Sequence, residues 1–362
     1  MCGRGPGLFT KWGVELAYTV IWSVKTLVCR LPPLDDSEHM FYSRGMPRPQ
    51  YVEVTCKSAL NRVQGMPFKW SLNPYAGCVH ACVYCYARSH YAVAGHGDAG
   101  REFETRILVK TNFAEILRRE LGRPRWAFES VALGTVTDCY QPAEGRYKIT
   151  RAALEALRDV ANPVGMVTKS PLVLRDLDIL APLAQAAKVR IFFTITTVDL
   201  DLWRRLEPGT ASPFKRLEVM RRLNEAGVRA GVLLAPILPG ITDSVASLDA
   251  VAQAAAEYGA AFLGTSTLRL STVVKEQYLD FVDGAFPDLT ERYERAYVGS
   301  NAPNEYQRAL DERVERIRTR YGFVSDSMRQ SALTSANLRS PAAPPEPAFR
   351  RIGPQLLLPM VP

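Results

Sequence analysis

Short apolar runs of strand-forming residues alternate with segments of helical periodicity through the middle of this chain. The clear runs lie at residues 131–136, 164–168, 189–197, 228–237 and 261–270. The segments between them place apolar side chains three or four positions apart, as on one face of a helix. Repeated strand and helix units of this kind build a parallel sheet covered by helices. The alternation therefore predicts an α/β fold.

A partial (β/α)6 TIM-like barrel is the form of this fold that we expect. The predicted helices are marked by the apolar positions Phe113, Leu117 and Leu121, then Leu154, Leu157 and Val160, then Leu217, Met220 and Leu223. A short extended piece at residues 70–75 would supply a sixth strand. A doubly wound open sheet is the alternative, but it usually carries a glycine-rich phosphate turn, and no G-x-G-x-x-G follows a predicted strand. In a barrel, functional residues lie at the C-terminal ends of the strands.

The two ends of the chain differ in composition from this middle part. We expect residues 1–45 to form a poorly ordered N-terminal extension, 46–335 the barrel domain and 336–362 a Pro-rich disordered tail. The apolar run at 14–24 is too short to span a bilayer, which predicts no membrane partner. A signal peptide or an interfacial helix remains an open alternative for this run.

Charge and cysteine usage limit the setting in which the chain works. The formal net charge of +8 is compatible with a nucleic-acid partner without requiring one. The seven cysteines are an odd number and are scattered unevenly, unlike the disulfide framework of a small secreted domain. We therefore predict a reducing, cytoplasmic location.

Three of the cysteines stand within eight positions, directly after the predicted strand at 70–75. Cys78, Cys82 and Cys85 form C-x3-C-x2-C in the segment GCVHACVYCYAR. Thiolates are the usual ligands of iron-sulfur clusters, and three of them leave one iron of a four-iron cluster open to a second molecule. Structural zinc is one alternative, but it needs a fourth ligand. A redox pair of Cys82 and Cys85 is another alternative.

This spacing, with the aromatic Tyr84 before the last cysteine, resembles the radical S-adenosylmethionine (SAM) superfamily. The longer wording is similar to the spore photoproduct lyase-like branch, and the likeness runs from about Ser58 to Tyr321. It implies that the three cysteines hold a [4Fe-4S] cluster whose open iron binds S-adenosyl-L-methionine. Reductive cleavage of this cofactor would release methionine and a 5'-deoxyadenosyl radical, which abstracts hydrogen from the substrate.

The resemblance also implies which other residues bind the cofactor. Tyr84 would lie against the adenine, Thr137 and Asp138 would bind the amino group or ribose, and Lys169 would pair with the methionine carboxylate. Thr196 and the backbone at Ala235 would line the same site. Two further predictions concern the substrate. Arg269 would bind an anionic group, and Glu207 with Pro208 and Gly209 would form a shaped loop or simply a turn.

The chain departs from the lyase pattern at the hydrogen-atom donor. The lyase has a cysteine just before the Ser-Asp pair at the end of its second strand, whereas this chain has Val136 there, followed by Thr137 and Asp138. Thymine-dimer repair is therefore not predicted. Cys139 as a displaced donor is one hypothesis, and a small buried cysteine is the other.

These observations predict a radical SAM enzyme with an unknown substrate, of which DNA or another nucleotide-bearing molecule is the leading candidate. A reductant such as flavodoxin or ferredoxin would be its partner. The rival is a non-catalytic zinc or iron-sulfur module that binds nucleic acid. A third alternative is a degenerate barrel that binds the cluster without turnover.

Overall fold

The main sheet of the computed structural model contains the six predicted strands, aligned in parallel. Residues 48–66 and 68–323 are described, so the predicted extension at 1–45 and the predicted tail at 336–362 lie outside the described residues. The strand order is β10-β9-β8-β7-β6-β3-β2, and only the pairing of β2 with β3 is antiparallel. The strands are β2 (Asn61–Arg62), β3 (Trp70–Leu72), β6 (Val131–Leu133), β7 (Val164–Thr168), β8 (Val189–Thr194), β9 (Ala230–Ile237) and β10 (Leu263–Thr267). Since no pairing joins β10 to β2 in the described ranges, the sheet is open, as in a partial barrel.

A second, smaller sheet was not predicted. It has the order β1-β5-β4, with β1 (Gln50–Val54) parallel to β5 (Arg106–Lys110) and β4 (Tyr75–Ala76) antiparallel to it. The piece predicted as one strand at 70–75 is therefore two strands in two different sheets. The chain leaves the main sheet after Leu72 and joins the small sheet at Tyr75. This crossing ends directly before the three clustered cysteines.

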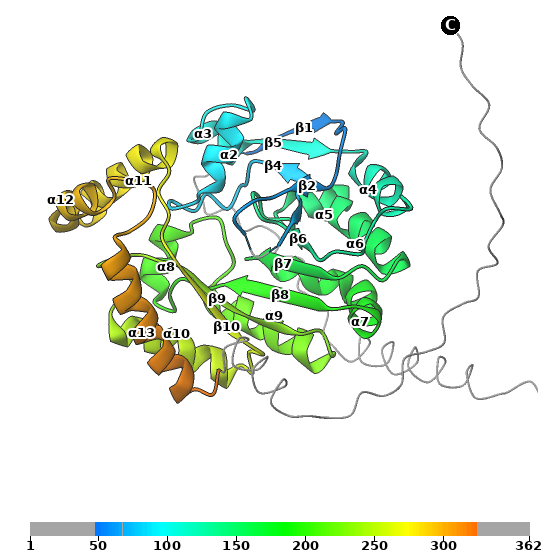
Figure 1. Ribbon diagram of the computed structural model, residues 1–362. Coiled ribbons are helices and arrows are strands. Elements are labelled where there is room, and N and C mark those ends of the chain that lie inside the picture. Colours follow the sequence, from blue (N-terminus) through cyan, green and yellow to red (C-terminus); the bar gives the residue numbers. More distant parts are fainter. Residues whose placement is uncertain (1–47, 67, 324–362) are drawn as a thin grey trace, which may run out of the picture. The chain divides into compact units, whose positions relative to one another are not determined.

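Helices cover the outer face of the main sheet, as Figure 1 shows. The helices at the three predicted positions are α4 (Phe113–Leu121), α6 (Ile149–Asp159) and α9 (Pro213–Glu225), although Val160 is the residue that follows α6. The others are α2 (Ala87–Val93), α3 (Arg101–Thr105), α5 (Ala143–Tyr147), the 3-10 helix η2 (Pro171–Asp176), α7 (Leu177–Ala186), α8 (Leu200–Leu206), α10 (Val245–Glu257), α11 (Thr272–Ala285), α12 (Pro287–Ala296) and α13 (Asn304–Arg320). No helix in the described part of the chain has the length and apolarity needed to cross a membrane.

Helix α9 illustrates why these segments are helical. The Ser212 hydroxyl accepts a hydrogen bond from the Lys215 amide, and Pro213 takes the first helical position, where its missing N–H costs nothing. Leu217, Met220 and Leu223 are at most 1% exposed. Their spacing places them on one face, which packs into the main core beneath the sheet. The core thereby holds the C-terminal ends of β6, β7 and β8 at one edge.

Candidate active site

The loop that carries the three cysteines lies close against the small sheet. Its first residue, Gly77, has φ +82°, and a Cβ there would be 2.9 Å from the carbonyl oxygens of Arg106 and Phe103. Only glycine adopts this backbone conformation at low cost in so little space. The Cys78 amide then donates to the Phe103 carbonyl at 2.9 Å. The position of the first cysteine is thus set by backbone contacts.

The three thiols are free and lie close together. Cys78 and Cys82 are buried in two neighbouring groups of apolar side chains. Cys85 is partly buried and packs against both groups. Burial raises the pKa of Cys78, and the nearby Asp138, Cys85 and Cys82 raise it further. Burial also raises the pKa of Cys82 to about 12, although Lys169 acts against this shift. A metal centre would therefore have to displace protons from these thiols.

The chemistry of this donor set fits an iron-sulfur cluster. Within the described ranges, no group of three or more His, Cys, Asp or Glu side chains converges closely enough to hold a metal ion. Structural zinc needs four ligands around one ion, whereas the cysteines of a cluster each take a different iron. Three free thiols from one loop suit the second arrangement.

Gln141 holds the backbone on both sides of Cys78. Its side-chain amide donates to the Gly77 carbonyl at 3.0 Å and accepts from the Val79 amide at 3.3 Å. The Thr137 hydroxyl donates to the same Gly77 carbonyl at 2.7 Å. The Thr137 hydroxyl thus binds the cysteine loop, and its predicted contact with the cofactor stays a prediction. Gln141 was not predicted, and its only signal in the sequence is its position four residues after Thr137.

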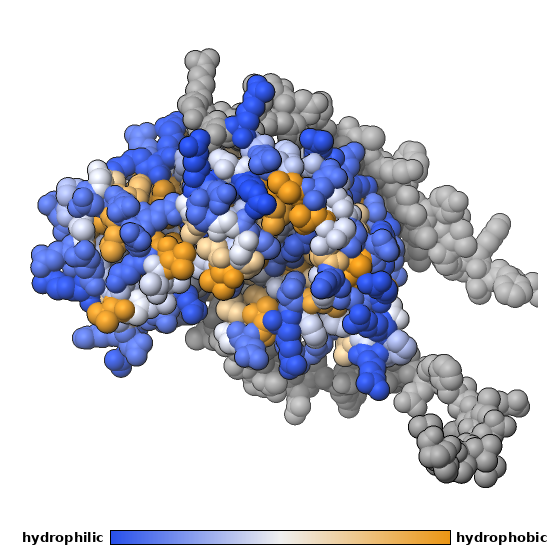
Figure 2. All heavy atoms as spheres, turned by 90° about the horizontal axis from the view of Figure 1, so that it is seen from above, coloured by the Kyte–Doolittle hydropathy of each residue, from blue (hydrophilic) through white to orange (hydrophobic). Residues whose placement is uncertain are grey.

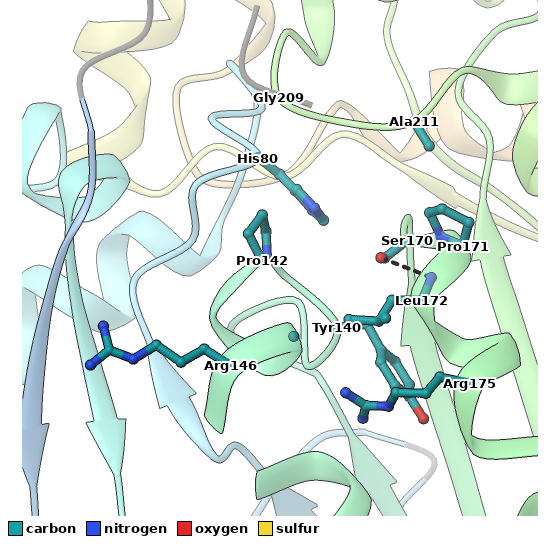
Figure 3. A pocket seen from close by; sticks show the side chains of 11 residues that line it. His80, Tyr140, Pro142, Arg146, Ser170, Pro171, Leu172, Arg175, Gly209 and Ala211 are labelled. Carbon is teal, nitrogen blue, oxygen red and sulfur yellow. Dashed lines mark hydrogen bonds between the residues drawn. The ribbon is translucent and has the colours of Figure 1, made fainter. Parts of the chain in front are cut away.

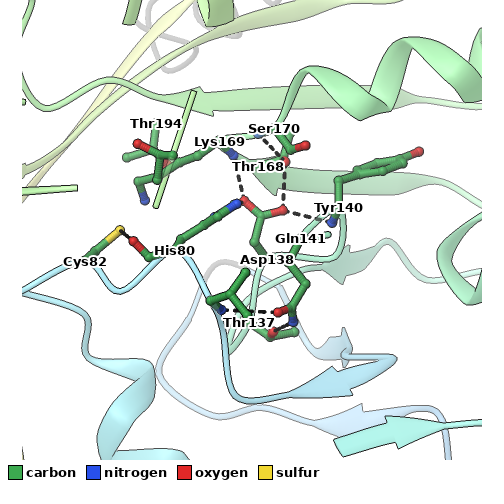
Figure 4. A network of polar contacts seen from close by, with 12 residues as sticks. His80, Cys82, Thr137, Asp138, Tyr140, Gln141, Thr168, Lys169, Ser170 and Thr194 are labelled. Atoms are coloured by element: carbon green, nitrogen blue, oxygen red, sulfur yellow. Dashed lines mark hydrogen bonds and ion pairs between the residues drawn. The ribbon is translucent and has the colours of Figure 1, made fainter. Parts of the chain in front are cut away.

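Asp138 is the centre of a buried polar network, which Figure 4 shows. Its carboxylate accepts from the Thr168 hydroxyl at 2.8 Å and from the amides of Lys169 and Tyr140 at 2.7 and 2.9 Å, and it lies 3.3 Å from Nδ1 of His80. A carboxylate has about four acceptor positions, and these groups take them up. The carboxylate therefore fixes His80, which belongs to the cysteine loop, to the end of β7. Its predicted contact with the cofactor stays a prediction.

The charge of Asp138 is stabilised in spite of burial. Burial acts to raise the pKa, but the facing His80 and the hydrogen bonds from the backbone outweigh it and hold the pKa at about 2. The group is therefore an anion at neutral pH.

Four of the predicted cofactor residues meet beside Cys82. The Tyr84 hydroxyl lies 3.1 Å from Oγ1 of Thr196, and that hydroxyl lies 3.3 Å from the Ala235 carbonyl oxygen. Nζ of Lys169 lies 5.8 Å from the centre of the Tyr84 ring. Burial acts to lower the pKa of Lys169, but the nearby Cys82 and Glu207 outweigh it and raise the pKa. A cation next to the thiols is thus available to an anionic ligand.

A buried ion pair supports Tyr84 from behind. The Tyr84 hydroxyl donates to Glu207, which also accepts from the Arg216 guanidinium. Arg216 is fully buried and donates to the carbonyls of Thr194 and Ala211 at 2.7 and 2.8 Å. The turn predicted at Glu207, Pro208 and Gly209 is confirmed, since the Thr210 amide donates to the Glu207 carbonyl at 3.2 Å, and the Glu207 side chain itself is buried. Arg216 was not predicted, since a single arginine between the apolar residues of a helix resembles a solvated side chain.

Two other predicted residues lie elsewhere. Cys139 has no exposed surface and packs in the main core, where its sulfur would be 3.1 Å from a Cβ at Gly134. This environment is that of a structural cysteine, and its role as a donor stays a prediction. Arg269 is exposed and forms an isolated bridge with Asn301. Val136, at the position of the lyase donor, packs against the apolar group that contains Cys78.

A cavity of about 420 Å³ opens beside the cysteine loop, as Figure 3 shows. Its walls come from the loop itself and from the segments that follow β6, β7 and α8. The lining residues are His80, Tyr140, Pro142, Gly145, Arg146, Ser170, Pro171, Leu172, Arg175, Gly209 and Ala211. Sequence reasoning did not predict this cavity, because no motif links these segments.

Comparison with known proteins identifies relatives of this chain. A family model described as the radical SAM superfamily matches residues 72–251. An uncharacterised protein of Mycobacterium tuberculosis is 35% identical over 331 residues, which are 88% of this chain and 97% of that protein. A radical SAM Nα-GlyT isomerase of Pseudomonas phage M6 is 25% identical over 171 residues, 46% of this chain and 33% of the isomerase.

A similar fold is found in spore photoproduct lyase. A mutant of that enzyme with bound S-adenosylmethionine and dinucleoside spore photoproduct superimposes with a TM-score of 0.59 over 77% of this chain and 85% of the lyase. The two sequences are 17% identical, so the likeness concerns the fold.

Proposed function

The chain belongs to the radical SAM superfamily and is a radical SAM enzyme, and on this basis we propose that Cys78, Cys82 and Cys85 hold a [4Fe-4S] cluster that binds S-adenosyl-L-methionine. The observation that carries the proposal is the group of three free thiols beside Lys169 and Tyr84. When bound, the cluster supplies the electron that cleaves the cofactor to methionine and a 5'-deoxyadenosyl radical, which abstracts hydrogen from the substrate.

The residues around the thiols have the chemistry that this cofactor needs. Lys169 is a cation suited to the methionine carboxylate, and Tyr84 offers an aromatic face to the adenine. Thr196 and the Ala235 carbonyl are polar groups at the ends of neighbouring strands. We assign all four to binding of the cofactor, and we assign Thr137 and Asp138 to holding the loop that carries the thiols.

The proposed substrate is DNA or another nucleotide-bearing molecule. The net charge of +8 and the dinucleoside bound to the lyase of similar fold support this choice. Because Val136 stands where the lyase has its donor, we expect a reaction other than thymine-dimer repair. A reductant such as flavodoxin or ferredoxin in the cytoplasm would be the electron source.

Methionine release after anaerobic reconstitution tests this function. With dithionite and S-adenosylmethionine, the wild-type enzyme should form 5'-deoxyadenosine and methionine, and Cys82→Ala should form neither. Cys139→Ala is the matched control, since this buried cysteine lies in the core, and it should retain most of the activity. Tightly held zinc in the wild type would instead support the non-catalytic module. Bound iron without any 5'-deoxyadenosine would support the degenerate barrel.

A further inference from the structure

The cavity beside the cysteine loop is walled mainly by apolar groups. Pro142, Pro171, Leu172 and Ala211 form much of its lining. Its volume of about 420 Å³ lies within the range of about 300–1,000 Å³ that is usual for small-molecule sites. It also lies at the C-terminal ends of β6 and β7, where (β/α) enzymes bind their ligands. A ring with flat apolar faces would suit these walls.

His80 presents a polar group to this cavity. Its side chain is 6% exposed, and its ring points into the space between Pro142 and Ser170 (Figure 3). Nδ1 faces the Asp138 carboxylate at 3.3 Å, whereas the other ring nitrogen has no partner among the described residues. This nitrogen is not fully shielded from solvent, so a ligand or a water molecule in the cavity can bind it. The carboxylate therefore holds one side of the ring so that the other side faces an occupant.

The charged groups of the cavity wall are already paired or point outward. The Arg175 guanidinium donates to the carboxylates of Asp176 and Glu144, with distances of 2.8 and 2.5 Å. Arg146 points away from the centre of the cavity in Figure 3. Ser170 adds a buried hydroxyl that accepts from the Leu172 amide at 3.3 Å and can still donate. An occupant would meet hydrogen-bonding groups but no unpaired charge in the interior.

We propose that this cavity binds the base of the substrate, a neutral nitrogen heterocycle, with its faces against the prolines and Leu172 and its polar edge at His80 and Ser170. The inference rests on the proposed function, because it takes the occupant to be the substrate of the radical reaction. His80 lies between Cys78 and Cys82, so the occupant would touch the loop that carries the cluster ligands.

Binding of nucleosides to the SAM-saturated holoenzyme tests this inference without turnover. Saturation with S-adenosylmethionine, and the absence of reductant, keep the adenosine site filled and unreacted. The probes are deoxyadenosine, deoxyguanosine, deoxycytidine and thymidine, with deoxyribose as the probe that lacks a ring, measured by anaerobic calorimetry. We expect at least one nucleoside to bind, and deoxyribose not to bind.

A matched pair of glycine variants places the binding in this cavity. Gly145 lines the cavity and Gly284 lies in α11, and both are exposed, helical and without any atom within 4 Å of an added Cβ. Gly145→Trp should weaken nucleoside binding at least tenfold, while Gly284→Trp should leave it unchanged, with equal iron content in both. Absence of nucleoside binding to the wild type, or equal binding by both variants, would overturn the inference. Methionine release is measured separately, so a failure of the proposed function is distinguishable from a failure of this one.

Discussion

At the scale of single residues, the low pKa of Asp138 predicts how stability depends on pH. A pKa held at about 2, compared with 3.8, corresponds to about 2–3 kcal/mol at about 1.4 kcal/mol per pKa unit. Because the pKa is lowered in the folded protein, this contribution is complete above about pH 4 and is lost as the pH falls toward 2. Asp138→Asn should therefore lower the free energy of unfolding at pH 7 by about that amount.

Urea unfolding of the apo-protein at several pH values measures this effect. The difference between the wild type and Asp138→Asn should shrink as the pH falls from 4 to 2. Asp201→Asn, at an exposed carboxylate, is the control and should behave like the wild type at every pH. A difference that stays constant with pH would show that the carboxylate charge is not what stabilises the network.

Gln141 allows a second test at this scale. Gln141→Leu keeps a similar volume but leaves the Val79 amide without its partner and removes one donor to the Gly77 carbonyl. We expect a loss of about 1–3 kcal/mol in unfolding free energy and faster loss of iron from the reconstituted protein to a chelator. Gln253→Leu, at an exposed position in α10, should change neither. Unchanged iron retention in Gln141→Leu would contradict a role in holding the loop.

The residues that sequence reasoning identified are those in motifs of fixed spacing. The thiols and Tyr84 share one motif, and the resemblance to the radical SAM superfamily, together with the expected barrel, placed Lys169 beside them. Gln141 and Arg216 could not be predicted from the sequence, because their contacts are with backbone carbonyls and amides that come together only in the folded chain. No short-range pattern records such contacts.

At the scale of elements, the segment after α8 is fitted closely to the cysteine loop. A Cβ at Gly209 would lie 2.4 Å from the Val79 carbonyl oxygen and 2.9 Å from Cα of His80. Gly209→Ala should push the two segments apart, lower the midpoint of thermal unfolding and reduce the iron bound per chain. The control is Gly145→Ala, because an added Cβ at this exposed helical position would meet no atom within 4 Å. This substitution should leave the unfolding free energy unchanged or raise it by up to about 1 kcal/mol. Normal iron content in Gly209→Ala would mean that this contact is not needed for the site.

The parallel strands were predictable, but the small sheet was not. The strands β6 to β9 lie in largely apolar runs, and each is followed by a helical pattern. By contrast, β3 and β4 are short and adjacent, and only their partners assign them to different sheets. The strand β6 ends at Leu133, earlier than the predicted residue 136, since Gly134 adopts φ +81° directly after it.

At the scale of the whole molecule, one face of the surface shows how its apolar side chains are distributed. Figure 2 shows the apolar side chains of one face as small separate groups among hydrophilic ones. Residues 336–362, whose composition is Pro-rich, are the disordered tail expected from the sequence. A chain that ends at residue 335 should therefore have the same thermal midpoint and iron content as the full chain. A lower midpoint would show that the tail packs on the domain.

The proposed function requires that three cysteines leave one iron of a four-iron cluster open to S-adenosylmethionine. Electron paramagnetic resonance of the reduced, reconstituted enzyme, with and without the cofactor, tests it most directly. We expect about four irons per chain and a cluster signal that changes when S-adenosylmethionine is added, with no such cluster in Cys82→Ala. A cluster signal that is the same with and without the cofactor, or a protein that binds only zinc, would contradict it.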